Sequence, residues 1–65
     1  MAKIEVSFIE SERKIVMAEI NSLGYGFDYD YAPYSHNVII INDISPNDKE
    51  KFICFLDERE ISWGN

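Results

Sequence analysis

Apolar and polar residues alternate along the first part of the chain. Between residues 3 and 9 every second residue is apolar, at Ile4, Val6 and Phe8, and the residues between them are Lys, Glu and Ser. A period of two with β-branched and aromatic side chains is typical of a strand that buries one face. We therefore predict a first strand over residues 3–9, with its apolar row directed into a core.

A helical period follows this strand. Val16, Ile20 and Leu23 recur at intervals of three and four residues, which places them on one face of a helix. Ser11 is positioned to cap the start of this helix with its hydroxyl, and Gly24 is positioned to end it in the left-handed conformation. The first unit of the chain is therefore predicted to be a strand followed by a helix.

The period of two returns in residues 25–31 and is followed by a continuous aliphatic run. The aromatic positions of this alternation are Tyr25, Phe27, Tyr29 and Tyr31. Residues 32–37 are rich in turn-forming residues, and residues 38–41 are Val-Ile-Ile-Ile. This pattern predicts a hairpin with a loop of several residues. Because its second strand is apolar on both faces, we expect a central strand that is covered on both sides.

The clearest local signal in the chain marks the start of a second helix. Ser45 is an N-capping residue, Pro46 suits the first helical position, and Asp48 can reach back toward the cap as in a capping box. The apolar residues of this helix are Phe52, Ile53, Phe55 and Leu56. We expect the helix to end near Arg59, and residues 61–63 to form a short edge strand or a packed tail.

The predicted order is strand, helix, strand, strand, helix and short strand. This order predicts an α+β two-layer sandwich, ferredoxin-like βαββα(β), with an antiparallel sheet and two helices on one face. If the last strand does not pair, a three-stranded βαββα sandwich remains. We expect the 65 residues to form a single domain over residues 1–65. Many unrelated functions use this architecture, so the fold alone does not identify one.

Charge narrows the range of partners. The chain carries 12 acidic and 6 basic residues, a net charge of −6, which disfavours direct binding to nucleic acid. Residues 15–48 contain no Lys or Arg. The acidic residues of this segment are Glu19, Asp28, Asp30, Asp43 and Asp48. The negative charge is therefore concentrated in the middle of the chain.

Cysteine content and the lack of long apolar segments indicate the cellular setting. The single cysteine, Cys54, cannot form an internal disulfide. The first residues carry no apolar signal segment, and the longest aliphatic run, residues 38–41, is far too short to span a bilayer. We therefore expect a cytoplasmic protein with no membrane partner.

The sequence lacks the motifs of common catalytic and metal sites. Cys54 lies among acidic residues, which disfavour a reactive thiolate. His36, the single histidine, is interpreted as a turn residue rather than a general base. Residues 28–30 begin like a calcium-binding loop, but the glycine and the terminal glutamate are absent. Residues 24–26 lack the third glycine of a phosphate-binding loop. We therefore expect no enzymatic activity, no metal and no cofactor.

The orientation of the aromatic row decides which surface the sheet exposes. If the row faces the helices, the arrangement that we favour, Asp28 and Asp30 join Glu5 on the open face as an acidic patch. If it faces outward, the strand presents a tyrosine-rich surface that suits a protein partner. In both cases one row of residues 38–41 points to the open face. Such a row suggests burial against another chain, although two exposed aliphatic residues are also compatible with a free surface.

We interpret the chain as a small acidic protein–protein interaction module, a non-catalytic inhibitor or regulator that occupies a basic surface on a larger protein. A nucleic-acid-binding protein is one such target. Phages and mobile elements encode proteins of this size and charge. In this interpretation Asp28, Asp30 and Asp43 pair with Lys or Arg of the partner. The aromatic anchors are Tyr29, Tyr31 and Tyr34.

Two other functions fit the same sequence. A ferredoxin-like regulatory domain would pair with itself as a homodimer and hold a small-molecule ligand at the interface. A structural subunit of a larger assembly would use the open face only for packing. All three functions need an exposed apolar face, so the sequence does not separate them.

Overall fold

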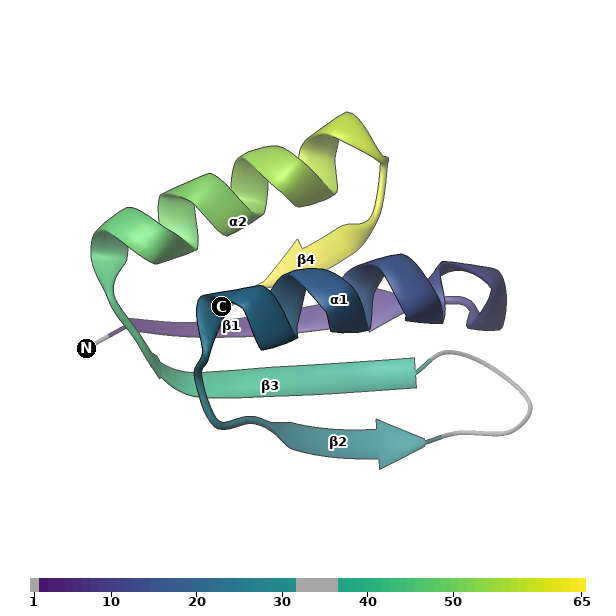
Figure 1. The fold of residues 1–65 in the computed structure, drawn as a ribbon, viewed down its shortest axis with the longest axis horizontal. Coiled ribbons are helices and arrows are strands. Elements are labelled where there is room, and N and C mark those ends of the chain that lie inside the picture. Colours follow the sequence, from purple (N-terminus) through teal and green to yellow (C-terminus); the bar gives the residue numbers. More distant parts are fainter. Residues whose placement is uncertain (1, 32–36) are drawn as a thin grey trace.

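The computed structural model describes residues 2–31 and 37–65 (Figure 1). The elements are β1 (Ala2–Phe8), the 3-10 turn η1 (Glu10–Glu12), α1 (Arg13–Leu23), β2 (Asp28–Tyr31), β3 (Asn37–Ile44), α2 (Pro46–Glu58) and β4 (Ser62–Gly64). The four strands form one sheet in the order β2-β3-β1-β4, and every neighbouring pair is antiparallel. The predicted α+β class and antiparallel sheet are therefore confirmed, and the short last strand pairs with β1.

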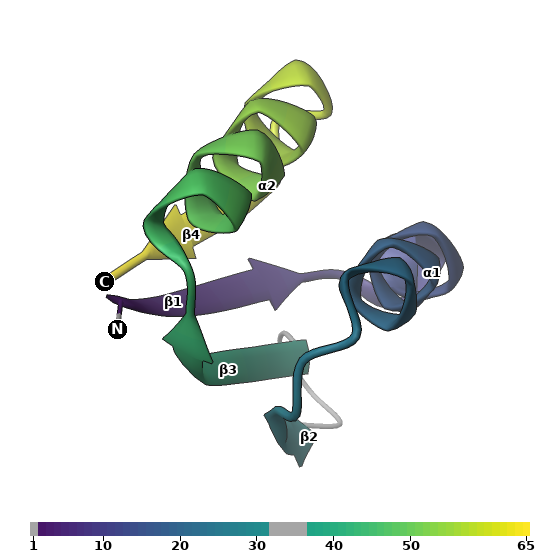
Figure 2. The same ribbon diagram turned by 60° about the vertical axis from the view of Figure 1, so that its left-hand side comes forward.

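The molecule has two layers. Figure 2 shows both helices on the same side of the sheet, with α2 above β4 and β1 and with the other side of the sheet uncovered. At the β4 edge, the indole Nε1 of Trp63 donates a hydrogen bond of 2.9 Å to Oδ1 of Asp57 in α2. Neither helix in the described ranges combines the length and the apolar character needed to cross a membrane.

The core lies between the sheet and the two helices. Its buried apolar residues come from both layers. They are Ile4, Val6, Phe8, Val16, Ile20, Ile39, Ile41, Ile44, Phe52, Leu56 and Ile61. The strand residues among them follow the period of two, except that Ile44 is three residues after Ile41, and the helix residues follow the helical period, because each element buries one face. The predicted apolar faces of β1, α1 and α2 are thus confirmed.

Three predicted helix boundaries are confirmed. Gly24 ends α1 with a φ of 80°, and its N–H donates to the carbonyl of Ile20 at 3.2 Å. Ser45 caps α2, because its hydroxyl oxygen accepts the N–H of Asp48 at 3.2 Å, and Pro46 occupies the first helical position. The last residue of α2 is Glu58, immediately before the predicted end.

The predicted cap at Ser11 is wrong. The first turn begins earlier, at Ile9, whose carbonyl accepts the N–H of Glu12 at 2.9 Å. The carboxylate of Glu12 in turn accepts the N–H of Ile9 at 3.1 Å. This reciprocal pair satisfies the backbone groups at the start of the turn without a hydroxyl side chain. A 3-10 turn therefore precedes α1.

The aromatic segment forms a shorter strand than the prediction of residues 25–31. Strand β2 begins at Asp28, and Tyr25 lies outside the ladder with its hydroxyl bonded to α2. Strand β3, which pairs with β2, is also irregular near this end of the sheet. Ala2 pairs with Ile44 and Ile4 with Ile41, so β3 holds one extra residue between these pairs. Such a bulge bends a strand and ends regular pairing.

Candidate functional site

The open face of the sheet consists of two rows of residues that cross all four strands. Strand register defines the rows, because paired residues in an antiparallel ladder project to the same side. From β2 to β4 the first row is Asp28, Ile40, Glu5 and Gly64. The second row is Asp30, Val38, Ser7 and Ser62. We call these eight residues the open face.

Each row has an aliphatic residue on β3 with a carboxylate on the neighbouring edge strand. Val38 and Ile40 are half-buried, whereas Ile39 and Ile41 between and beside them are buried under the helices. Asp28 and Asp30 are exposed. The side chains alternate because successive residues of a strand project to opposite faces. The predicted acidic patch beside an aliphatic row is therefore the arrangement found.

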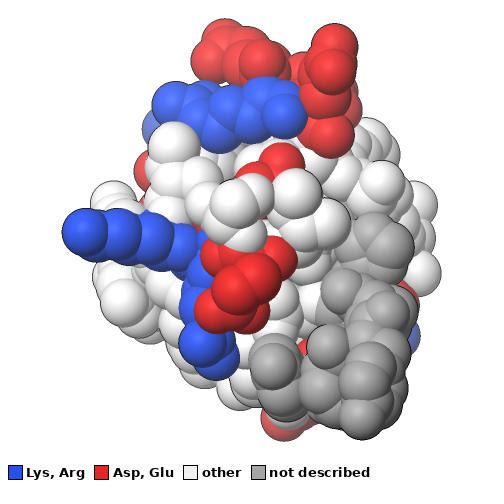
Figure 3. All heavy atoms as spheres, turned by 90° about the vertical axis from the view of Figure 1, so that its right-hand side faces the viewer, with Lys and Arg blue, Asp and Glu red and all other residues white. Residues whose placement is uncertain are grey.

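The charge of the open face differs from that of the helices. Lys3 lies at one end of β1, beyond the two rows, and the rows themselves contain no Lys or Arg. The remaining basic residues are Arg13 and Lys14 in α1, Lys49 and Lys51 in α2, and Arg59 at the end of α2. At the end of the molecule shown in Figure 3, blue and red side chains lie side by side. The helical layer thus carries charges of both signs, whereas every charged residue in the two rows of the open face is acidic.

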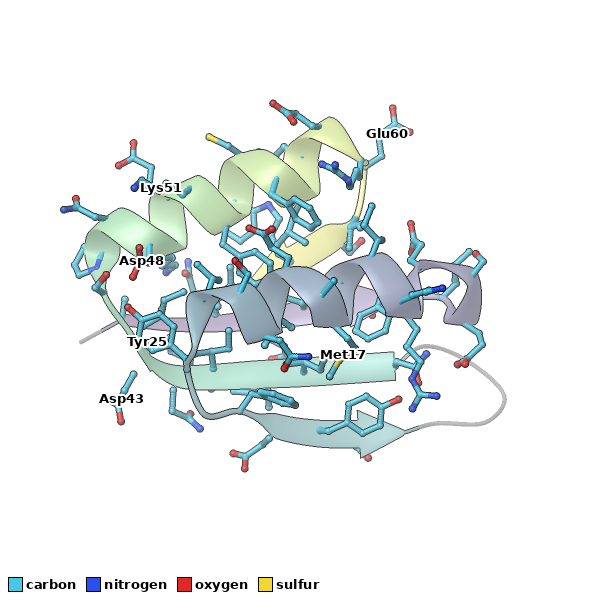
Figure 4. All side chains as sticks on the ribbon, viewed as in Figure 1. Met17, Tyr25, Asp43, Asp48, Lys51 and Glu60 are labelled. Atoms are coloured by element: carbon cyan, nitrogen blue, oxygen red, sulfur yellow. The ribbon has the colours of Figure 1, made fainter. Side chains whose placement is uncertain are left out.

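A hollow at one end of the sheet brings Asp28 close to Asp43. Its volume is about 280 Å³. Its lining residues are Tyr25, Gly26, Phe27, Asp28, Asn42 and Asp43. The amide Nδ2 of Asn42 donates to Oδ2 of Asp28 at 3.1 Å, and Asp43 extends away from the end of β3 (Figure 4). Three predicted acidic site residues, Asp28, Asp30 and Asp43, therefore lie along the open face and its end.

Tyr29 faces the helices and is not brought together with these carboxylates. Its hydroxyl accepts from Nη2 of Arg13 at 2.7 Å and donates to Oδ1 of Asn37 at 2.7 Å. The buried Asn37 donates to Oε2 of Glu10 at 3.2 Å, and Glu10 forms an ion pair with Arg13 at 3.3 Å. These four side chains close a ring that joins the start of α1 to the hairpin.

No short-range pattern in the sequence predicts this ring. Its members are up to 27 positions apart, and Asn37 belonged to the predicted turn.

Of the other predicted anchors, Tyr31 pairs with Asn37 in the ladder. Tyr34 and His36 lie outside the described residues. Cys54 is exposed on α2.

A second tyrosine of the aromatic row anchors the start of α2. The hydroxyl of Tyr25 donates to Oδ2 of Asp48 at 2.5 Å and accepts the N–H of Ser45 at 3.2 Å, and Figure 4 shows Tyr25 and Asp48 pointing toward one another. The predicted capping box is incomplete, because the Ser45 N–H, which the Asp48 carboxylate would accept in such a box, donates to the Tyr25 hydroxyl instead. Hydrogen bonds from Tyr25 and then from Ser45 lower the pKa of Asp48 below its ordinary value of 3.8.

Comparison with known proteins identifies a similar fold. No protein-family model and no curated protein sequence matches the chain. The solution structure of the PlyG cell wall binding domain matches with a TM-score of 0.81 and 19% sequence identity. The match covers 95% of this chain and 74% of that one. At this identity the match shows a shared fold alone.

Proposed function

We propose that this chain is a small, acidic, non-catalytic binding module that occupies a basic surface on a larger protein. The observation that carries the proposal is the composition of the open face. An aliphatic pair, Val38 and Ile40, lies between carboxylates on β2 and the carboxylate of Glu5 on β1. An inhibitor or regulator of the kind that phages encode would use such a surface.

The aliphatic pair and the carboxylates have different roles in this proposal. Val38 and Ile40 supply apolar area that a partner removes from water. Neighbouring strands are about 4.8 Å apart, so Asp28 and Glu5 stand about 10 Å apart across Ile40. Carboxylates around an apolar centre attract Lys and Arg, accelerate encounter and reject acidic partners. The open face therefore suits a partner with aliphatic side chains flanked by bases.

The same charges oppose self-association through this face. Two copies placed face to face would bring together two surfaces that each carry Glu5, Asp28 and Asp30. Like charges at a desolvated interface are unfavourable. A homodimer that holds a ligand between open faces is for this reason the weaker proposal. Light scattering over a wide range of protein concentration tests it, and a persistent dimer abolished by Ile40→Glu would support it against our proposal.

The ferredoxin-like assignment of the fold is part of the proposal. Strand order β2-β3-β1-β4 with antiparallel neighbours supports it, as does the presence of a helix between β1 and β2 and between β3 and β4. An experimental structure tests it through the handedness of these two connections, which are expected to be right-handed.

A selection from a displayed peptide library tests the function. The wild-type protein is the bait, and the Asp28→Asn/Asp30→Asn variant removes peptides that bind elsewhere. We expect enrichment of peptides that combine Lys or Arg with aliphatic residues. A second variant, Glu50→Gln/Glu58→Gln, changes two exposed residues of α2 and has the same net charge. We expect the enriched peptides to bind the wild type and Glu50→Gln/Glu58→Gln more tightly than Asp28→Asn/Asp30→Asn. If they bind all three proteins equally, or carry no basic residues, the proposal is wrong.

Cell wall binding is a second candidate, favoured by the match to the PlyG cell wall binding domain over 95% of this chain. Co-sedimentation of the purified chain with bacterial cell walls tests it. If the chain sediments with walls and the variants Ile40→Ser and Asp28→Asn/Asp30→Asn do so equally well, a wall-binding surface elsewhere replaces the open face as the functional site.

A further inference from the structure

The spacing of the residues on the open face indicates the secondary structure of its ligand. Val38 and Ile40 are two residues apart on β3, which corresponds to about 6.8 Å in an antiparallel strand. Asp28 and Asp30 repeat this spacing on β2. In an α-helix, residues four apart rise by about 6 Å and lie on nearly the same face. A helix laid along β3 therefore matches both pairs at once.

We propose that the open face binds a cationic amphipathic helix of the partner protein, laid along β3. This inference rests on the proposed function. Two aliphatic residues at positions i and i+4 of the helix contact Val38 and Ile40. Basic residues at i−3 and i+1 lie on average about 60° around the helix from this apolar pair, on the side of β2, where they pair with Asp28 and Asp30.

A single extended strand does not meet these requirements. A strand turns only every second side chain toward a surface, so it presents one row, apolar or basic, rather than an apolar row with a basic flank. Its backbone N–H and C=O groups would also lie over Val38 and Ile40 without partners, whereas a helix satisfies its own backbone. The charge and apolar pattern of the open face therefore favours a helix.

The other side of the same sheet shows how a helix covers this strand. Ile39 and Ile41, which alternate with the open-face pair, are fully buried in the core with Val16 and Ile20 of α1. A partner helix on the open face would add a third layer to the two-layer sandwich and would remove the half-buried Val38 and Ile40 from water. The partner helix would therefore bind without a preformed groove in the open face.

The β4 side of the open face has room for the second flank of the helix. Glu5, Ser7, Ser62, Trp63 and Gly64 line a hollow of about 290 Å³. A Cβ added at Gly64 would meet nothing within 4 Å. The open face thus has two carboxylates, Asp28 and Asp30, on the β2 side, and a hollow with one carboxylate, Glu5, on the β4 side. This asymmetry directs the basic flank of the helix toward β2 and a bulky side chain toward β4.

Three synthetic peptides of identical composition, made of Leu, Lys and Ala, test the inference. The first places Leu at i and i+4 with Lys at i−3 and i+1. The second permutes the same residues so that Lys surrounds the helix. The third alternates Lys and Leu as a strand. We expect the first to bind, to gain helical circular dichroism on binding, and to shift the amide resonances of Ser7, Val38 and Ile40.

Charge-matched variants separate specific binding from general attraction. We expect Asp28→Asn/Asp30→Asn to lower the affinity for the first peptide at least tenfold. Gly64→Trp should also lower this affinity, because the indole fills the hollow. Glu50→Gln/Glu58→Gln should leave its affinity unchanged. The thermal midpoint of each variant verifies that the fold is intact.

The remaining outcomes overturn either the inference or the proposed function. If the third peptide binds more tightly than the first, and Asp28→Asn/Asp30→Asn weakens it, the helical ligand is wrong and the proposed function stands. If the first peptide binds both charge variants equally, the inference is wrong. If no peptide binds and the display selection enriches no basic sequences, the proposed function is wrong as well.

Discussion

Ile39 and Ile40 are adjacent in the chain and chemically identical, yet they belong to different surfaces. Ile39 has no exposed area and lies in the core under the helices, whereas Ile40 is half-buried on the open face between Asp28 and Glu5. The difference shows that the residue type does not determine the role of an aliphatic side chain in a central strand. Its position relative to the neighbouring strands and the helical layer determines it.

The two sides of the sheet also differ in how their polar groups are held. On the helical side, Tyr25 and Tyr29 anchor the starts of α2 and α1 through hydrogen bonds to Asp48 and Arg13. On the open face, Asp28 has a hydrogen bond from Asn42 within the described ranges. The helical side therefore contributes stability through both its apolar and its polar residues, and the open face is the surface that we propose for binding.

The largest expected effect contrasts the two neighbouring isoleucines. Ile39→Ala leaves a cavity in the core and should lower the free energy of unfolding by about 3 kcal/mol. Ile40→Ala on the open face should lower it by less than about 1 kcal/mol. Urea denaturation at neutral pH measures both. Equal losses would mean that the open face contributes to the core and would contradict the comparison.

The ring around Tyr29 should give the next largest effect. Asn37→Ala removes the acceptor of the Tyr29 hydroxyl and one donor to the Glu10 carboxylate, although both groups keep their contact with Arg13, and it should cost about 2 kcal/mol of stability. Tyr29→Phe should cost about 1 kcal/mol. Because the two side chains share a hydrogen bond, the double variant should cost less than the sum of the single variants. Additive losses in thermal denaturation would show that this bond is not formed.

Two serines distinguish a real helix cap from a predicted one. Ser45→Ala removes the acceptor of the Asp48 N–H and should lower the free energy of unfolding by about 1 kcal/mol. Ser11→Ala is the matched control, because its hydroxyl caps no helix in the structure, and it should have no measurable effect. Chemical denaturation of both variants checks this. A loss at Ser11 would restore the sequence-based assignment.

The pH dependence of stability tests the Tyr25 anchor. The pKa of Asp48 is lowered in the folded state, so its contribution is present above the ordinary value of 3.8 and is lost as the pH falls below it toward the folded-state pKa. Thermal midpoints between neutral pH and pH 2 should fall less steeply in Tyr25→Phe than in the wild type. An NMR titration of Asp48 should show its pKa rising in that variant.

The smallest expected change in stability belongs to the acidic edge of the open face. Asp28→Asn/Asp30→Asn should alter the free energy of unfolding by no more than about 0.5 kcal/mol, because both carboxylates are exposed. Urea denaturation alongside the peptide-binding measurements checks this. A large destabilisation would assign the two residues a structural role and remove the contrast between the faces.

Local patterns in the sequence predicted most of the fold. The alternation in β1, the caps at Gly24 and Ser45, and the presence of two aliphatic rows in residues 38–41 depend on neighbouring residues, so the sequence shows them directly. The orientation that exposes Asp28 and Asp30 followed from the predicted direction of the aromatic row toward the helices, where Tyr25 and Phe27 are half-buried. Tyr29 remained a predicted partner anchor because its contacts, Arg13 and Asn37, depend on how distant elements pack. The Tyr25–Asp48 bond was missed for the same reason.

The identity of the aliphatic residues in β3 has a consequence for folding. If β3 paired with β1 one position out of step, Val38 and Ile40 would enter the core in place of Ile39 and Ile41, with almost no loss of apolar burial. The same shift would bury the amide of Asn42 and remove Asn37 from the Glu10 carboxylate. The asparagines at either end of the aliphatic run, rather than the run itself, therefore restrict this strand to a single alignment.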